Sequence, residues 1–315
     1  MKKLVTALLS GALMLGAVPA AAYAEGNSSE KTAEVDGVTY TYTIEDSDPA
    51  GITIMSVSEV EGAFTMPEKI DGYKVTGIYD KAFFGQTKLE FINLPNSIEY
   101  IGRSAFAGCT SMTELVIPDS VATIGDGAFM GCSKLLTASV GKGVREIPDD
   151  CFFSCPSLAE IYLPSNLTKI GDEAFFGCPK LDTLIPETVT EIGYRALGYQ
   201  PAAHSYSTAM QVKGFIVGGK VGSAAETYAE ENNFDFLDPD NYLEGDVNKD
   251  GKVDAKDASA VLSEYSRAST GAELTFTPWQ KYVGDMKPDM VIDANDASRI
   301  LIEYARLSTT SDSAL

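Results

Sequence analysis

Two acidic segments near the C-terminus carry residue types that could bind a divalent metal ion. The first reads GDVNKDGKVDAKDAS from Gly245, and the second reads GDMKPDMVIDANDAS from Gly284, 39 residues later. Oxygen ligands recur in the first segment at positions 1, 3, 5, 7, 9 and 12 of a loop: Asp246, Asn248, Asp250, Lys252 through its carbonyl, Asp254 and Asp257. Ca²⁺ takes six to eight oxygens, and Gly251 permits the sharp turn at position 6. The spacing therefore predicts a calcium site rather than a merely acidic turn.

The second segment keeps only part of this ligand set. Four positions still carry carboxylates: Asp285, Asp289, Asp293 and Asp296. Position 3 is Lys287, whose ammonium cannot ligate a cation and repels it at close range. Position 6 is Met290, whose Cβ resists the positive φ that glycine adopts freely. We therefore predict a weak or absent second calcium site, in which Lys287 neutralises the carboxylates.

Each acidic segment leads directly into an apolar stripe at helical spacing. The two stripes are 39 residues apart and consist of Ala258, Val261, Leu262 and Tyr265, then Ala297, Ile300, Leu301 and Tyr304. No helix is expected before the first loop, and its position 12 is Asp rather than Glu, so the arrangement departs from an EF-hand. Two loop-helix halves with the phrases VDAKDASAVLSEY and IDANDASRILIEY resemble the type I-like dockerin of cellulosomes. The resemblance covers residues 245–309.

This resemblance implies a small all-α module that binds calcium and docks a secreted protein onto the cohesin of a scaffold protein. In the family, cohesin is contacted by loop positions 10 and 11 and by the following helix, here Ala255, Lys256, Ser259, Ala294, Asn295 and Ser298. Arg267 and Arg306 lie near the helix ends. The two halves are so alike that a cohesin could meet either face after a half-turn. Lys256 against Asn295 breaks this symmetry and favours one binding mode.

The middle of the chain, residues 75–199, is a repeat. Its register is marked by phenylalanines 23 residues apart: Phe83, Phe106, Phe129, Phe152 and Phe175. The last unit, from Ile170 to Ile192, is 22 residues long. Each unit predicts a short helical turn at Ala-Phe and a strand at L-x-x-I-x-L-P. One unit cannot bury its own apolar face, so we expect a right-handed α/β solenoid with parallel strands. The A-F-x-G-C and I-P-x-S-V phrases resemble BspA-like leucine-rich repeats over roughly residues 60–236.

Segments on either side of the repeats are expected to cap the solenoid. Within residues 25–74, VDGVTYTYTI and GITIMSVS alternate like the two strands of a hairpin. Within residues 200–236, FIVGG, SAAETYAEENN and FDFLD predict a strand, a helix and a strand. Residues 237–244 then form a polar linker. These patterns divide the chain after residue 24 into a cap, repeats, a second cap, a linker and the docking module.

The five cysteines follow the repeat. Four of them recur at one repeat position, 23 residues apart: Cys109, Cys132, Cys155 and Cys178. Cys151 takes a place that other units give to alanine. An exported protein could use such residues for disulfides or for a metal. Equivalent positions on stacked coils form an inward ladder, however, and an odd number of cysteines cannot pair completely, so we predict structural free thiols.

Side chains facing outward from the predicted strands form a candidate binding face. They are Phe91, Asn93, Glu114, Val116, Glu160 and Tyr162, with Thr137 and Ser139 between them. Adjacent strands lie about 4.8 Å apart, so five repeats give a face about 20 to 25 Å wide. That width suits one small protein domain or a glycan chain. The alternative is a spacer whose outer side chains are merely solvated.

The N-terminus has the layout of a secretory signal peptide. Residues 1–24 contain two lysines, an apolar run from Leu4 to about Val18, and small residues before Ala24. The run falls short of the ~20 apolar residues of a membrane span, so we expect cleavage rather than membrane insertion. Cleavage takes the formal charge from -21 to -23 by removing two lysines. Such acidity opposes binding to nucleic acid and anionic lipid but attracts divalent cations.

Few residues have a pattern that could serve catalysis. His204, the single histidine, lies in the loop-like stretch PAAHSYS, and the acidic pair Asp149 and Asp150 falls at a variable turn of the repeat. Motifs of nucleophilic and metal hydrolases and phosphate loops are absent from the sequence. We predict a secreted, non-catalytic component of a cellulosome-type complex, held at the cell surface through its scaffold. The alternatives are a cellulosomal carbohydrate-active enzyme, such as a glycoside hydrolase, and a surface adhesin.

Overall fold

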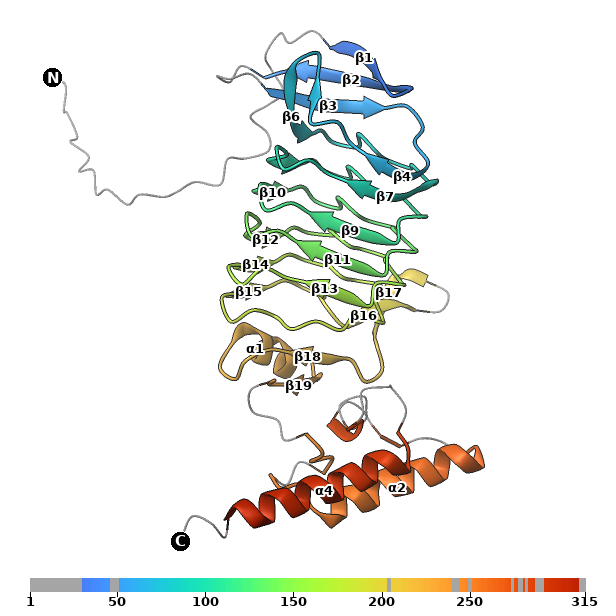
Figure 1. The fold of residues 1–315 in the computed structure, drawn as a ribbon, viewed down its shortest axis with the longest axis vertical. Helices are drawn as coiled ribbons and strands as arrows, with labels where there is room; N and C mark the ends of the chain where they lie inside the picture. Colours follow the sequence, from blue (N-terminus) through green and yellow to red (C-terminus); the bar gives the residue numbers. More distant parts are fainter. Residues whose placement is uncertain are drawn as a thin grey trace, which may run out of the picture.

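A stack of β-strand coils forms the body of the molecule and is followed by a pair of helices (Figure 1). This computed structural model describes residues 30–45, 51–202, 205–239, 244–248, 251–272, 275–276, 280, 283–286 and 292–311. The proposed signal peptide, His204 and the metal-loop residues Asp250, Lys287, Asp289 and Met290 lie outside these ranges. Within the described ranges, no helix has the length and apolar composition that a membrane span requires.

The N-terminal cap is an antiparallel sheet joined to the first coil by a parallel pairing. Its strands are β1 (Lys31–Val35), β2 (Val38–Ile44) and β3 (Gly51–Val57). The predicted hairpin of β2 and β3 is confirmed, whereas β1, which adds to β2, was not predicted because its side chains are mostly exposed and show little apolar alternation. β3 pairs parallel with β6 (Tyr73–Ile78), and the short β5 (Lys69–Ile70) pairs with β6.

Each coil of the repeat contributes a strand to each of two ladders. The ladder of predicted strands consists of β4 (Gly62–Thr65), β7 (Leu89–Asn93), β9 (Glu114–Ile117), β11 (Thr137–Val140) and β13 (Glu160–Tyr162). The other ladder has two-residue strands and is interrupted between β10 and β12: β8 (Tyr100–Ile101), β10 (Thr123–Ile124), β12 (Glu146–Ile147), β14 (Lys169–Ile170) and β15 (Glu191–Ile192). All strand pairings between successive coils are parallel. Sequence reasoning missed the second ladder because two residues are too few to reveal a period.

The Ala-Phe segments form successive turns rather than helices, which corrects the α/β class predicted for the repeats. The N–H of Phe83 donates to the carbonyl of Ala105 at 2.8 Å, and that of Phe106 donates to Ala128 at 2.7 Å. These N–H groups therefore bond to the next coil instead of to a carbonyl four residues back, as an α-helix requires. The repeat region is a parallel β-solenoid.

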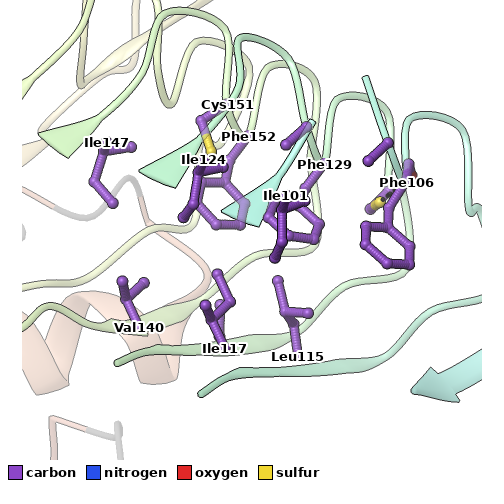
Figure 2. Packing of buried hydrophobic residues seen from close by; sticks show 14 of the residues in the cluster. Ile101, Phe106, Leu115, Ile117, Ile124, Phe129, Val140, Ile147, Cys151 and Phe152 are labelled. Atoms are coloured by element: carbon purple, nitrogen blue, oxygen red, sulfur yellow. Dashed lines mark hydrogen bonds between the residues drawn. The ribbon is translucent and has the colours of Figure 1, made fainter. Parts of the chain in front are cut away.

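A row of phenylalanine rings fills the centre of the solenoid. Successive rings from Phe83 to Phe175 have centroids 4.8, 5.5, 5.4 and 5.4 Å apart and are stacked. Figure 2 shows three of these rings in line, with Leu115, Ile117 and Val140 across the core from them. Stacked aromatic pairs add about 0.5–1.5 kcal/mol each beyond the apolar area they bury. Each 23-residue unit thus adds one layer to the core, with one phenylalanine ring in each layer.

The cysteines form a second internal ladder. Four of the five cysteines donate from Sγ to the carbonyl of the phenylalanine 26 residues earlier, at 3.2 to 3.4 Å, in the pairs Cys109–Phe83, Cys132–Phe106, Cys155–Phe129 and Cys178–Phe152. All five cysteines are buried and free, in agreement with the predicted structural thiols. Burial raises the pKa of Cys109 from 9.0 to about 12.

The C-terminal cap consists of a hairpin followed by the predicted strand, helix and strand. The hairpin is β16 (Tyr199–Ala202) with β17 (Ser205–Gln211), and it was not predicted. The cap continues with β18 (Ile216–Gly218), α1 (Ala224–Glu231) and β19 (Asp235–Leu237), with β18 and β19 parallel. The hydroxyl of Tyr228 donates to the carbonyl of Leu197 at 2.8 Å, so α1 is fixed to the last coil.

Two helices, α2 (Ala255–Thr270) and α4 (Ala294–Ser311), form the C-terminal module. Its buried cluster consists of Val247, Val253, Ala258, Val261, Val283, Ala297 and Ile300, and it includes Leu237 from β19. Leu262, Tyr265, Leu301 and Tyr304, predicted to share the apolar stripe, are instead 41 to 45% exposed. Two packed helices bury only a narrow stripe of side chains on each helix. The other residues of the predicted stripe therefore face outward.

Candidate functional site

The predicted binding residues lie on the outer face of the β13-β11-β9-β7-β4 sheet. Strand register pairs Phe91 with Glu114, and Val116 with Ser139, which in turn pairs with Tyr162. Asn93, Glu114, Val116, Glu160 and Tyr162 are exposed, whereas Phe91, Thr137 and Ser139 are half-buried. The structure therefore brings these side chains together on one face, and ligand binding by them stays a prediction.

A groove of about 720 Å³ lies at the β13 end of this face. It is lined by β13, by residues 179–184 after the fifth phenylalanine, and by residues 212–218 of the C-terminal cap. Tyr162 is 62% exposed and Leu184 is 52% exposed. Of the predicted face residues, Glu160 and Tyr162 line the groove, whereas the contributions of Lys180, Asp182 and Lys213 were missed.

The groove exists because the fifth repeat is one residue short. Asp182 pairs with Glu160 of β13, but Leu184 pairs with Gly218, so the chain leaves β13 and joins the cap between these two points. Leu181 and Ile185 are still buried. With one residue fewer between them, Leu184 cannot reach the interior and lies at the surface. The 22-residue step was visible in the sequence and could have indicated this opening.

Charged groups of both signs meet in the groove. The Tyr162 hydroxyl donates to Oε2 of Glu160 at 2.8 Å. Partial desolvation, followed by repulsion from Glu160, raises the pKa of the Asp182 carboxyl. Lys180 and Lys213 are the basic residues among those that line the groove. The groove therefore offers hydrogen-bond donors and acceptors beside an open aromatic ring.

The first acidic loop is folded back on itself by its own carboxylates. Asp246 Oδ2 accepts from the N–H of Gly251 at 2.9 Å, and Gly251 has the positive φ, +79°, expected at position 6. Asp257 Oδ1 accepts from the N–H of Asn248 at 3.2 Å, and Asp257 Oδ2 accepts from Asp254 N–H at 2.9 Å. Positions 1 and 12 are thus tied to the loop between them. Asp246 and Asp257 are buried, as ligands that converge on one point would be.

The described part of the second loop repeats this pattern. Asp296 Oδ2 accepts from the N–H of Asp293 at 2.8 Å, and Asp293 Oδ1 accepts from Asn295 N–H at 2.6 Å. The same two bonds start α2, where Asp254 Oδ1 accepts from Lys256 N–H at 2.7 Å and Asp254 and Asp257 form a capping box. Both halves therefore start their helix through the same pair of carboxylates.

No group of three or more acidic, histidine or cysteine side chains within the described residues is placed to hold a metal ion. The donor chemistry of the first loop fits Ca²⁺, since Asp246, Asn248, Asp254 and Asp257 supply carboxylate and amide oxygens at loop spacing. Asp250 and the second-loop residues Lys287, Asp289 and Met290 lie outside the described ranges. Calcium binding and the weakness of the second site stay predictions.

Glu264 is a buried carboxylate that sequence reasoning missed. It is 2% exposed on α2, and it accepts from the N–H of Thr275 at 2.8 and 3.0 Å, from the Thr275 hydroxyl at 2.9 Å, and from Phe276 N–H at 2.9 Å. Its counterpart 39 residues later, Glu303, instead accepts from Nε of Arg306 at 2.8 Å on the surface. Glu264 thus fixes the connecting segment to α2, and the two halves differ at this position.

The predicted cohesin-contact residues lie on the outside of the helical module. All six are exposed: Ala255, Lys256, Ser259, Ala294, Asn295 and Ser298. Exposed apolar side chains follow them on both helices, namely Leu262, Tyr265, Leu301, Ile302 and Tyr304. We call these eleven residues the helical face. Contiguous exposed apolar side chains are typical of protein-binding sites.

One member of the acidic pair considered for catalysis, Asp149, has a structural role. Asp149 Oδ1 accepts from the N–H of Asp172 in the next coil at 2.8 Å, and Asp172 Oδ1 accepts in the same way from Tyr194 N–H at 2.7 Å. Asp150 has a φ of +56° at a turn position. These carboxylates join successive coils.

Comparison with known proteins defines the class of the solenoid. Residues 76–202 match the family described as BspA type leucine rich repeat region, in six copies. The chain therefore carries a BspA-type leucine-rich repeat region, and the helical module lies outside that match. No curated protein matches the chain.

Several solved bacterial structures are similar to the repeat region. A leucine rich cell surface protein from Faecalibacterium prausnitzii is 23% identical with a TM-score of 0.42, and the match covers 60% of this chain and 62% of that one. A leucine-rich repeat protein from Bacteroides ovatus is 24% identical with a TM-score of 0.37, covering 61% and 62%. The T. pallidum leucine rich repeat protein is 27% identical with a TM-score of 0.29, covering 45% and 88%. The chain thus spans less than two thirds of the first two relatives.

Proposed function

We propose that this protein is a secreted, non-catalytic binding protein. Its leucine-rich repeats recognise a protein or glycan, and its C-terminal module is a calcium-dependent dockerin that attaches it to a cohesin on a surface scaffold. The observation that carries the proposal is the pair of loop-helix halves, 39 residues apart, whose carboxylates make equivalent bonds at Asp254 and Asp293. The helical face supports it, because its apolar side chains are exposed.

The proposed mechanism is binding without chemistry. When calcium is bound, it supplies a charge that holds the carboxylates of the first loop together. Asp246 and Asp257 fix the two ends of that loop, and Asp254 fixes the start of α2. The packing of α2 on α4 through Val261 and Ile300 then sets the helical face. A folded face is presented for docking, and Glu264 fixes residues 275–276 of the connecting segment to α2.

The proposal is tested by binding of the full chain to a panel of cohesins, measured by biolayer interferometry with calcium and with EDTA. We expect at least one cohesin to bind in calcium and to dissociate in EDTA. Absence of binding to every cohesin in calcium would remove the proposal.

Two matched variants test whether one binding mode dominates. Leu262→Glu and Leu301→Glu place a charge at equivalent exposed positions of α2 and α4. If one mode dominates, one variant loses at least tenfold in affinity and the other keeps the wild-type value. Equal losses from both variants would contradict a single mode. Circular dichroism of each variant verifies that the helices are retained.

A further inference from the structure

The groove beside β13 differs from the rest of the outer sheet face because it is hollow and presents a bare aromatic ring. At the same register position, the neighbouring strands carry Ser139 and Val116, while β13 carries Tyr162. The ring of Tyr162 is 62% exposed. Its hydroxyl is held by Glu160, two residues earlier on the same strand. The ring is therefore held in place before any ligand binds. Its apolar face is exposed to solvent, and its hydroxyl is hydrogen-bonded to Glu160.

The formal charges of the side chains that line the groove sum to zero. Its lining includes the acids Glu160 and Asp182 and the bases Lys180 and Lys213. The complete chain, by contrast, has a formal charge of -21. An anionic ligand meets repulsion from the protein as a whole, and the two acids and two bases of the groove leave no net charge there to select a cation. The arrangement favours a neutral ligand that both donates and accepts hydrogen bonds.

The size of the groove favours a small ligand over a folded protein. Its volume of about 720 Å³ falls within the range of roughly 300–1,000 Å³ typical of small-ligand sites. A stable protein partner needs about 800 Å² of contact on each side. The groove is closed at one side by the cap residues 212–218, which limits such a contact.

From these features we infer that the groove binds a neutral oligosaccharide, with one sugar ring packed on Tyr162. The carboxylates of Glu160 and Asp182 accept from sugar hydroxyls, and the ammonium groups of Lys180 and Lys213 donate to them. Leu184 extends the apolar floor. This inference rests on the recognition role proposed for the repeats and names its ligand class and site.

The test is a glycan microarray probed with the full chain, carrying neutral cello-, xylo- and manno-oligosaccharides beside acidic oligogalacturonides. Neutral hits are then measured by isothermal titration with the wild type, Tyr162→Ala and Tyr194→Ala. Tyr194 is the control because it is the same residue type, is equally exposed at 62%, and does not line the groove. We expect neutral glycans to bind, Tyr162→Ala to lose about tenfold or more in affinity, and Tyr194→Ala to match the wild type.

Four results would overturn the inference. These are no glycan binding at millimolar concentration, a preference for the acidic oligosaccharides, an equal loss in Tyr194→Ala, and capture of peptides from a displayed library that depends on Tyr162. Cohesin binding by the same preparations separates this inference from the proposed docking function. Tyr162→Ala leaves cohesin binding unchanged, so either property can fail alone.

Discussion

Single side chains in the core of this solenoid serve several coils at once. Phe129 stacks on Phe106 and Phe152, and its N–H bonds to Cys151 of the next coil. Removing one ring leaves a cavity bounded by rings on both sides, which cannot collapse without shifting whole coils. Single core residues therefore affect more than one repeat.

Phe129→Ala should lower the free energy of unfolding of the repeats by about 3–5 kcal/mol, the range for buried aromatic truncations. Phe84→Ala is the matched control because Phe84 is 59% exposed in a neighbouring turn, and it should change stability by less than about 0.5 kcal/mol. Urea unfolding followed by far-ultraviolet circular dichroism measures both. A similar loss in the two variants would show that the ring stack is not the main stabilising feature.

The buried thiols should remain protonated well above the pH at which free cysteine ionises. Burial raises the pKa of Cys109 from 9.0 to about 12, so the folded state holds a proton that the unfolded state releases. This contribution to stability is complete below pH 9 and is lost as the pH rises toward 12. At pH 8.5 we expect no thiol to react with Ellman's reagent in the native protein and five to react in guanidinium. Fewer than five would indicate a disulfide.

Glu264 accounts for a difference between the two helical halves. Glu264→Ala removes both acceptor oxygens from the N–H groups of Thr275 and Phe276. We expect the free energy of unfolding to fall by about 1.5–3 kcal/mol, the contribution of hydrogen bonds to a charged group. The readout is faster hydrogen exchange at the amides of Thr275 and Phe276. Glu303→Ala, 39 residues later at the surface, is the control and should leave both amides protected.

At the scale of the element, the coils are joined by backbone groups that approach closely at glycines. A Cβ on Gly125 would lie 2.5 Å from the backbone nitrogen of Arg103 in the preceding coil. Gly131 differs, because it has a φ of +71° and a Cβ there would meet nothing within 3.7 Å. Gly125 is required because two coils approach closely there, and Gly131 is required because its backbone has a positive φ.

The alanine variants of these two glycines should differ in cost. Gly131→Ala meets only left-handed backbone strain, about 1 kcal/mol. Gly125→Ala must separate two coils, and we expect about 3 kcal/mol, the upper part of the range for overpacking. Urea unfolding of both variants gives the order. A larger loss for Gly131→Ala would contradict the close packing of backbone between these coils.

At the scale of the whole molecule, the repeats and the helical module have separate buried clusters that meet at the cap. Leu237 belongs to the helical cluster, and Ile216 packs against it. The five-strand face and the helical face therefore belong to parts with their own cores. Ile216 and Leu237 also line the groove, so the two parts are in contact beside it.

Removal of calcium should unfold the helical module and spare the repeats. The single tryptophan, Trp279, lies in the C-terminal segment of the sequence and reports on that module. With EGTA, the fluorescence transition should move to lower temperature while the β-sheet transition stays in place, because a bound ion stabilises only the state that binds it. Asp246→Asn should reproduce the shift without chelator, and Asp285→Asn should have little effect. Equal shifts in both variants would indicate two comparable sites.

Much of this architecture is determined by the sequence itself. The 23-residue step, the row from Phe83 to Phe175 and the cysteine ladder predict stacked coils, because only a layered core places equivalent residues in contact. Equivalent carboxylates at Asp254 and Asp293 likewise predict two similar loop-helix halves. These features are local or periodic, and periodicity can be read along a chain.

The tertiary structure decided what depends on residues far apart in sequence. The Ala-Phe segments form turns because their N–H groups bond to the next coil, and Glu264 is buried because Thr275 and Phe276 fold back onto α2. The groove arises where the chain stops pairing with β13, after Asp182, and pairs with Gly218 of the cap at Leu184. A sequence pattern shows that one residue is missing from the fifth repeat. Only the packing of the cap against that gap determines that the gap becomes a groove.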